Sequence, residues 1–532
     1  MQHFLPALLY ICFIGFLPLI YVTVKTLSIE KLKSKLFIKL LLKDFIRTFP
    51  ICALVALPVL IEPKITKTYL MIIQAVFMPL MFLELGHIYL FGVRIGLNTF
   101  YSFFVTNMRE TKEFISQNIP PILYIGIILF WAVPFYFLTF VPTPTYSSTF
   151  IQAVIVIIAV FITIPFLRNL PKRWPKFKDG YVLNPYSNLI YHYFAYRRNY
   201  LALRKTIAEN KAPAFDEIIS NLKGPQTYLI VIGESSNSMH YSCYGYPRNT
   251  NEFTDKIKSE IISFSGVRSQ FAQTMPSLEK AISFADEKHP DFVYTKGSLI
   301  DYFKQAGFKT YWLSNQYALD ERDTVITAMT MHADYNKCFN FGGLKRFEKA
   351  GLDGDMLSDI QKILDNEEDK KVIFVHLIGS HAAYVNRYPA EFKHFEGKMP
   401  DKKLSPKNQE FLNTYDDSVR YTDWLLAEMI KKLKAQKGIN YLLYFSDHGE
   451  DVFDSTTTKL LGHSELANKA MTSVPLRIWL SKELEKVRPD IRKRATHLDK
   501  PYKLEDLIHT VIDISSLTNK DYTPKKSILN AD

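Results

Sequence analysis

Long, mostly apolar stretches near the amino terminus constrain this fold more than any other feature. A membrane-spanning helix needs ~20 mostly apolar residues. Gln2–Val24, Tyr69–Val93 and Ile119–Val141 meet that length, and Phe150–Phe166 is only slightly shorter. Thr48–Ile61 becomes a span only if part of the segment before it enters the membrane interface. We therefore predict an α-helical membrane domain of five helices.

The net charge of +12 predicts an anionic partner. Many basic residues flank the apolar segments, and no compact basic cluster of the nucleic-acid-binding type occurs. We therefore expect a membrane surface as partner and no nucleic acid. Basic runs follow the first and last spans, at Lys25–Arg47 and Arg168–Lys178. By the positive-inside rule alone, both runs and the polar part of the chain would face the cytoplasm.

Three regions follow from composition. Residues 1–168 form the predicted membrane domain, 169–225 an interfacial linker, and 226–532 an ordinary globular domain. Within the linker, Asn184–Ile207 alternates tyrosines and basic residues with aliphatic residues, which favours a helix at the membrane–water boundary.

Residues 226–532 alternate apolar runs with helical patterns, which predicts an α/β domain with a largely parallel sheet. The expected strands and their polar ends are Thr227–Ser236, Phe308–Ser314, Lys371–His381, Ile439–Glu450 and Val474–Ser481, and the longest expected helix is Asn408–Leu433. Because ligands bind at the carboxyl ends of strands in open α/β sheets, the residues at those ends are the candidate site.

Carboxylates, imidazoles and hydroxyls follow several of these strands. They are Glu234, Ser235 and Ser236; His376, Ser380 and His381; Asp447, His448 and Glu450; and, shortly afterwards, His463. Oxygen and nitrogen donors of this kind suit a divalent metal of the zinc type, and a metal-bound serine hydroxyl is an activated nucleophile. Any single motif also fits an ordinary polar turn, so the prediction depends on their combination.

These segments resemble the bacterial phosphoethanolamine transferases, members of the alkaline phosphatase and sulfatase superfamily. The segment VIGESSNSMHYSCYGYPRNTNEF resembles the family's nucleophile segment. The segments that match in the same order are TMPSLEKAISFAD, IGSHAAYVNRYP, NTYDDSVRYTDWLL, YFSDHGEDVFDS and GHSELANKAMTSVPLRIW, and TNMRETKEF resembles a polar segment between the third and fourth spans. The likeness covers nearly the whole chain.

The resemblance implies five membrane helices in the bacterial inner membrane and a periplasmic catalytic domain, which overrides the positive-inside count. It implies Glu234, Ser235, Asp447 and His448 as ligands of one tightly bound zinc ion, with Ser235 as nucleophile and Ser236 as the alternative. The other residues expected at the site are His381 and His463 for the phosphoryl group or a second, looser zinc ion, and Thr106, Asn107, Glu110, Ser236 and Lys459 for substrate.

The implied reaction moves phosphoethanolamine from phosphatidylethanolamine to lipid A or lipopolysaccharide core through a phosphoethanolamine–serine intermediate. A phosphoglycerol transferase of the same superfamily and a non-catalytic membrane scaffold are the alternatives. We expect a monomer. Family members often carry several disulfides, whereas here only Cys243 and Cys338 could pair in the catalytic domain, and their spacing leaves that pairing open.

Overall fold

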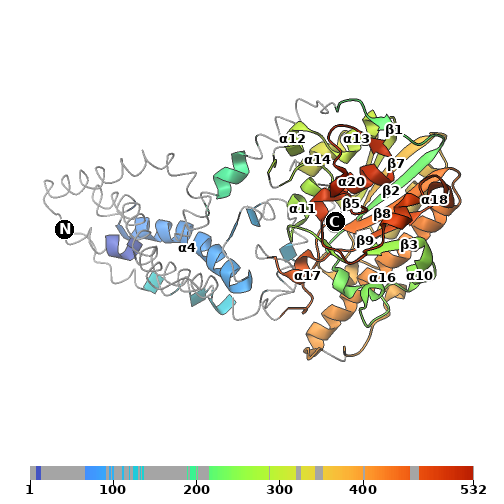
Figure 1. Ribbon diagram of the computed structural model, residues 1–532. Helices are drawn as coiled ribbons and strands as arrows, with labels where there is room; N and C mark the ends of the chain where they lie inside the picture. Colours follow the sequence, from blue (N-terminus) through green and yellow to red (C-terminus); the bar gives the residue numbers. More distant parts are fainter. Residues whose placement is uncertain are drawn as a thin grey trace. The chain divides into compact units, whose positions relative to one another are not determined.

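The computed structural model describes residues 215–530 except 287, 291, 319–324, 342–350, 400–401 and 456–466. Before residue 215 it describes 7–12, 66–91 and scattered positions between 55 and 201. The chain divides into two compact units, one of Met1–Phe100 with Ile119–Arg197, and one of Tyr101–Asn118 with Arg198–Asp532 (Figure 1).

One helix of the first unit is described over its whole length. Helix α4, Thr66–Phe91, corresponds to the third expected span, and within it Lys67–Leu90 is long and apolar enough to cross a membrane. It carries the buried Glu84 and His87, and the His87 Nε2 atom lies 3.2 Å from the Thr99 hydroxyl. The other four expected spans fall largely outside the described residues.

The second unit is built on a seven-stranded sheet with the order β3-β9-β8-β2-β7-β5-β6. The strands are β2 (Gln226–Gly233), β3 (Ile261–Phe264), β5 (Lys309–Ala318), β6 (Tyr335–Phe341), β7 (Lys370–His376), β8 (Ile439–Ser446) and β9 (Leu476–Leu480). Neighbours from β8 to β6 are parallel, which confirms the predicted parallel sheet. Strand β9 is instead antiparallel to β8 and to β3.

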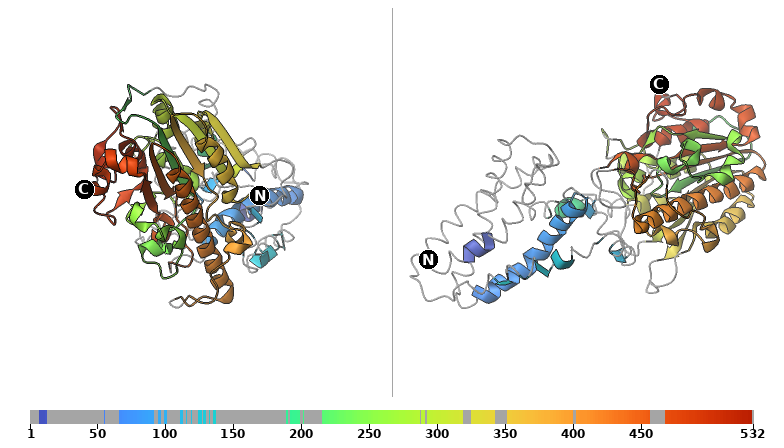
Figure 2. Two further views of the ribbon diagram at one scale, coloured as in Figure 1. Left: turned by 90° about the vertical axis from the view of Figure 1, so that its right-hand side faces the viewer. Right: turned by 90° about the horizontal axis from the view of Figure 1, so that it is seen from below.

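Helices cover both faces of this sheet (Figures 1 and 2). The helices described between residues 215 and 530 are α10 (Glu252–Asp255), α11 (Thr274–Ala281), α12 (Phe292–Thr295), α13 (Leu299–Gln305), α14 (Val325–Thr330), α15 (Leu357–Leu364), α16 (Pro406–Lys434), α17 (Lys469–Thr472), α18 (Lys482–Val487), α19 (Asp490–Arg494) and α20 (Leu507–Ile514). Short 3₁₀ turns include η3 (Ser238–His240) and η7 (Tyr384–Asn386).

Strand β2 shows why its residues form a central strand. All eight are buried, and successive side chains enter opposite cores. Tyr228, Ile230 and Ile232 join one core, whereas Leu229 and Val231 join the other. A continuous apolar run therefore fits a strand that is covered on both faces.

Helix α16 covers the second core along most of its length and is delimited by its own sequence. The Ser405 side chain accepts a hydrogen bond from the Asn408 N–H group, and Pro406 occupies the first turn, where no backbone donor is needed. The helix was expected at Asn408–Leu433 and is observed at Pro406–Lys434. Cys243 and Cys338 are not joined by a disulfide, so the pairing left open by their spacing is not formed.

Candidate metal centre

Two motifs far apart in the sequence meet because their strands are neighbours. Glu234 follows β2 directly, and Asp447 and His448 follow β8 directly. Gly233 is paired with Ser446 at the ends of these strands, and the Asp447 N–H donates to the Gly233 carbonyl at 3.2 Å. Parallel pairing in this register places both polar ends at one edge of the sheet.

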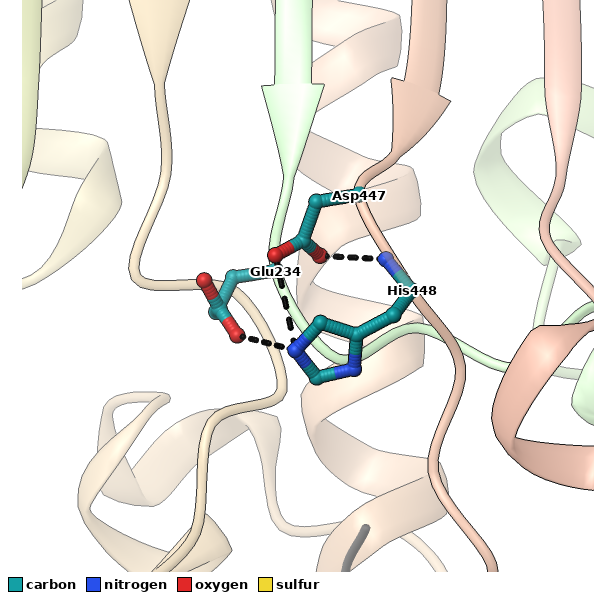
Figure 3. Close-up of side chains that lie close together, drawn as sticks. All are labelled: Glu234, Asp447 and His448. Atoms are coloured by element: carbon teal, nitrogen blue, oxygen red, sulfur yellow. Dashed lines mark hydrogen bonds and ion pairs between the residues drawn. The ribbon is translucent and has the colours of Figure 1, made fainter. Parts of the chain in front are cut away.

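Glu234, Asp447 and His448 offer three ligand atoms within 4.8 Å of one another. The Nε2 atom of His448 lies 3.3 Å from Glu234 Oε1 and 3.5 Å from Asp447 Oδ2 (Figure 3). The His448 Nδ1 atom is 2.8 Å from the Gly449 carbonyl, a contact that fixes the ring orientation and leaves Nε2 for the cluster. All three side chains are buried.

Thr274, the first residue of α11, supplies a fourth donor atom. Its hydroxyl lies 3.1 Å from Glu234 Oε2, 3.3 Å from Glu234 Oε1 and 3.3 Å from His448 Nε2. Unlike the other three residues, Thr274 is half-buried and remains accessible. The donor set is thus two carboxylates, one imidazole and one hydroxyl.

These separations fit a zinc ion. Ligands ~2.0–2.1 Å from a tetrahedral zinc ion are separated by about 3.3–3.4 Å, and the contacts of the His448 and Thr274 donors measure 3.1–3.5 Å. Asp447 Oδ2 is also a buried oxygen that accepts no hydrogen bond from the described residues. A buried carboxylate oxygen without a donor is costly, and a cation at this position would compensate it.

The electrostatics of the cluster point to the same conclusion. Burial and the neighbouring Glu234 carboxylate raise the pKa of Asp447. Burial alone would also raise the pKa of Glu234, but the hydrogen bond and charge of His448 outweigh it and hold that pKa below its ordinary value. Burial lowers the pKa of His448, and the two carboxylates more than reverse this effect. These raised pKa values mean that protons on Asp447 and His448 offset the buried negative charge when no metal ion is bound. A divalent cation at the same atoms would take the place of those protons.

Backbone contacts hold the ligands in place. The Ser235 N–H donates to Asp447 Oδ1 at 3.1 Å, and the Ser380 N–H donates to the Glu234 carbonyl at 2.9 Å. The Gln316 amide donates to Glu234 Oε2 at 3.2 Å. A donor from another strand or strand end of the sheet therefore orients each of these carboxylates: Ser235, after β2, for Asp447, and Gln316, in β5, for Glu234.

The two serines expected as nucleophile and alternative have different surroundings. The Ser235 hydroxyl donates to Glu234 Oε1 at 2.8 Å, but the residue is only 1% exposed. The Ser236 hydroxyl lies 2.8 Å from the Tyr241 hydroxyl, which in turn lies 2.9 Å from that of Tyr444. Ser235 thus borders the donor set, whereas the described contacts of Ser236 connect it to a buried pair of tyrosines.

The loop after β7 carries His381, which interacts electrostatically with Glu234 and contributes to the lowered pKa of that carboxyl. His381 Nδ1 and His376 Nε2 are buried atoms that find no hydrogen-bond partner among the described residues. The other expected site residues lie outside the described residues, and their roles stay predictions: Thr106, Asn107, Glu110, Lys459 and His463.

Sequence reasoning did not assign a role to Thr274. It lies at the start of a helix, not at a strand end, so the rule that located the other ligands could not find it. Its only signal was the segment TMPSLEKAISFAD, which took part in the family resemblance.

Comparison with known proteins agrees with this geometry. Residues 226–516 match the family model described as Sulfatase. The phosphoethanolamine transferase EptC of Escherichia coli K12 is 30% identical over 493 residues, which cover 89% of this chain and 84% of that protein. CptA of Salmonella typhimurium is 30% identical over 496 residues, with the same coverage.

Two solved structures match the two parts of the fold. The C-terminal periplasmic domain of E. coli EptC, crystallised in complex with zinc, is 32% identical, with a TM-score of 0.57 over 60% of this chain and 91% of that one. The integral membrane protein EptA of Neisseria meningitidis is 18% identical, with a TM-score of 0.67 over 99% of this chain and 98% of that one. The expected fold, a helical membrane domain followed by a sulfatase-like α/β domain, is thereby confirmed.

Proposed function

The chain belongs to the phosphoethanolamine transferases of the sulfatase family, and on that premise we propose that it transfers phosphoethanolamine from phosphatidylethanolamine to lipid A or lipopolysaccharide core. We further propose that it is a multi-pass protein of the inner membrane with its catalytic domain in the periplasm. The periplasmic origin of the matching EptC domain supports this location. The apolar helix α4 supports the membrane anchor.

The observation that carries the proposal is the four-donor set of Glu234, Asp447, His448 and Thr274. We propose one tightly bound zinc ion at these atoms, in agreement with the zinc complex of the EptC domain. Such an ion, when bound, lowers the pKa of a coordinated hydroxyl and offsets negative charge on a phosphoryl group. A second ion near His381 stays a prediction.

Thr274 is the better candidate nucleophile. Its hydroxyl contacts both Glu234 oxygens and His448 Nε2, and it is half-buried, so a lipid phosphate can approach it. Ser235 shares the contact with Glu234 but is 1% exposed, and its backbone N–H is already used to orient Asp447. Ser235 therefore suits a supporting role, and we propose that the covalent intermediate forms on Thr274.

The reaction takes place in two steps. The Thr274 oxygen attacks the headgroup phosphorus of phosphatidylethanolamine, and the bond from phosphorus to the diacylglycerol oxygen breaks. In the net reaction the hydroxyl proton of Thr274 ends on that diacylglycerol oxygen. A hydroxyl or a protonated phosphate oxygen of the acceptor then attacks the phosphorus, the bond to Thr274 breaks, and the proton that the acceptor oxygen loses ends on the threonine oxygen. This order predicts ping-pong kinetics.

Trypsin separates the two candidate nucleophiles, because Ser235 lies between Lys223 and Arg248 and Thr274 between Arg268 and Lys280. Full-length protein in detergent, loaded with zinc, is incubated with phosphatidylethanolamine, and both peptides are analysed by mass spectrometry. We expect a phosphoethanolamine adduct on Thr274 that Thr274→Ala abolishes and Ser235→Ala retains. An adduct on the peptide that contains Ser235 and Ser236 would instead show that one of these serines is the nucleophile.

The same experiment distinguishes the alternatives. An adduct that forms only from phosphatidylglycerol would show a phosphoglycerol transferase. A protein that binds no zinc and forms no adduct from either lipid would be a scaffold. A second incubation of the adduct with lipid A, or with lipopolysaccharide core lacking lipid A phosphates, identifies the acceptor by loss of the adduct.

A further inference from the structure

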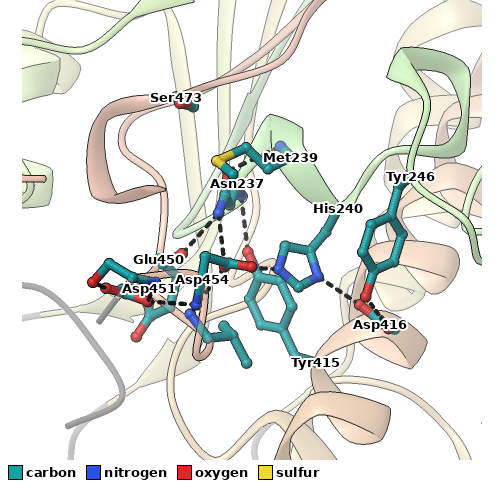
Figure 4. Close-up of polar contacts among 12 residues, drawn as sticks. Asn237, Met239, His240, Tyr246, Tyr415, Asp416, Glu450, Asp451, Asp454 and Ser473 are labelled. Atoms are coloured by element: carbon teal, nitrogen blue, oxygen red, sulfur yellow. Dashed lines mark hydrogen bonds and ion pairs between the residues drawn. The ribbon is translucent and has the colours of Figure 1, made fainter. Parts of the chain in front are cut away.

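A second buried polar cluster lies beside the metal centre and takes no part in the reaction described above. His240, the last residue of η3, is held between two aspartates (Figure 4). Its Nδ1 lies 2.7 Å from Asp416 Oδ1 on α16, and its Nε2 lies 2.9 Å from Asp454 Oδ2 in the segment after β8. The His240 and Asp416 side chains are fully buried, and that of Asp454 is 7% exposed.

This geometry identifies the charge on the ring. A neutral imidazole donates through one nitrogen only, whereas here both nitrogens face carboxylate oxygens, so both must carry a proton. Burial opposes the charge and lowers the pKa of His240, but Asp454 and Asp416 outweigh burial and raise this pKa to about 9. His240 is therefore an imidazolium at neutral pH.

Both aspartates have further partners. Asp416 Oδ2 accepts hydrogen bonds from Arg248 Nη1 at 2.7 Å and from the Tyr246 hydroxyl at 2.9 Å. Asp454 Oδ1 is paired with Lys402 Nζ at 2.6 Å. The cluster thus contains three cations and two carboxylates from four segments of the chain. Without the imidazolium, two buried carboxylates would face each other across the vacated position.

The cluster is connected to the metal centre through Asn237. The Asn237 Nδ2 group donates to Asp454 Oδ2 at 3.3 Å and to the Glu450 carbonyl at 3.0 Å. The Asn237 backbone N–H donates to the Tyr415 hydroxyl at 2.8 Å, and that hydroxyl donates to the Ser235 carbonyl at 2.9 Å. Through these contacts the cluster is linked to Ser235, which directly follows Glu234, and to Glu450, two residues after His448.

We propose that His240 is a positioning residue for phosphoethanolamine transfer: as a charged cross-link between α16 and the segment after β8, it holds the two strand ends that carry Glu234, Asp447 and His448 at the spacing that a metal ion needs. It acts through Asn237 and Tyr415, and its hydrogen bonds to described side chains go to Asp416 and Asp454 and to none of the proposed metal ligands. The inference rests on the proposed function, both for the zinc ion and for the kinetic readout, but zinc affinity is measured without substrate and so does not depend on transfer.

The test uses full-length protein in detergent and the variants His240→Gln and His332→Gln. The glutamine amide is neutral and cannot donate to two opposed carboxylates at once. His332 is the matched control, since its Nδ1 lies 2.6 Å from the buried Asp301, but it lies just before the amino end of β6, away from the site edge. Zinc affinity is measured by competition with a chromophoric chelator, and kcat and KM by transfer to lipopolysaccharide.

We expect His240→Gln to weaken zinc binding roughly 10- to 100-fold, the range for lost groups that orient metal ligands. The kcat at subsaturating zinc should fall with it, and KM should stay unchanged. His240→Arg, which keeps the charge and several donors, should recover part of the loss, and His332→Gln should match the wild type. Wild-type zinc affinity in His240→Gln, or an equal loss in His332→Gln, would overturn the proposal.

Tyr415→Phe keeps the inference testable if His240→Gln fails to fold, because it removes only the hydroxyl that joins Asn237 to the Ser235 carbonyl. It should weaken zinc binding by itself, and unchanged zinc affinity would refute the route through Tyr415. Where both variants fold, we combine His240→Gln with Tyr415→Phe. The double variant should bind zinc only slightly more weakly than the weaker-binding single variant, because both substitutions act on one path. Full additivity would equally exclude that route. If these variants lose zinc affinity as expected but the wild type transfers no phosphoethanolamine, the result would count against the proposed function and not against the role of His240.

Discussion

Gly379→Ala should damage the metal centre without touching a metal ligand. Gly379 lies in the loop after β7 at φ +50, and a Cβ atom there would lie 2.8 Å from the Glu234 carbonyl oxygen and 2.9 Å from its nitrogen. Real Cβ contacts essentially never fall below 3.0 Å, so the Glu234 backbone, the loop that carries Gly379 or both must shift, and the contact between them must change. The left-handed conformation costs an alanine ~1–2 kcal/mol, and the overlap adds ~1–3 kcal/mol.

Metal sites tolerate deviations of only about 0.2 Å in ligand distance, so the displaced carboxylate should bind zinc at least tenfold more weakly. Chelator competition measures the affinity, and thermal unfolding of the metal-free protein measures stability. Gly307→Ala is the control, because Gly307 has φ +84 but no atom within 4 Å of its added Cβ. Gly307→Ala should therefore lower stability but leave zinc affinity unchanged. Wild-type zinc affinity in Gly379→Ala would refute the reasoning that the loop after β7 sets the position of Glu234.

Three further predictions test the nucleophile, the metal and the buried charge. Thr274→Val should lower kcat by ~10³-fold or more, while Thr274→Ser keeps measurable transfer, because the hydroxyl forms the bond to phosphorus; a steady-state assay decides. Removing zinc should lower the unfolding free energy by ~2.7 kcal/mol relative to protein in zinc at 100 times its Kd, and calorimetry before and after zinc is added back measures this; equal stability would exclude a bound ion. The difference between the raised pKa of His240, about 9, and its ordinary 6.5 corresponds to ~3 kcal/mol. Because the folded pKa is the higher one, this stabilisation is complete below pH 6.5 and is lost as the pH rises through 9, so denaturation curves of wild type and His240→Gln should converge there.

Much of the catalytic unit could be read from local sequence. The uninterrupted apolar run before Glu234 predicted a strand buried on both faces, and β2 is such a strand. The polar residues after β2 and β8 were expected at one sheet edge, and pairing of these strands brings them there. These predictions succeeded because burial and strand ends are properties of short segments.

Other features depend on partners that local sequence does not specify. Strand β9 has the same kind of apolar run as the parallel strands of the sheet, yet it pairs antiparallel with β8. The direction of a strand is set by the path of the chain and not by its own residues. Thr274 joins the donor set only because α11 begins beside β2 and β8. His240 owes its charge to Asp416 and Asp454, which lie 176 and 214 residues away in the sequence.

The sequence by itself determined the division into an apolar anchor and an α/β domain, the strands that carry Glu234, Asp447 and His448, and the kind of metal that they suit. Only the tertiary structure decided which hydroxyl completes the donor set and which histidine is held as a cation. The physical reason is that composition and periodicity determine the burial of each segment. A hydrogen bond near 3 Å, such as that of the Thr274 hydroxyl to Glu234 or that of His240 to Asp454, depends on how distant segments pack.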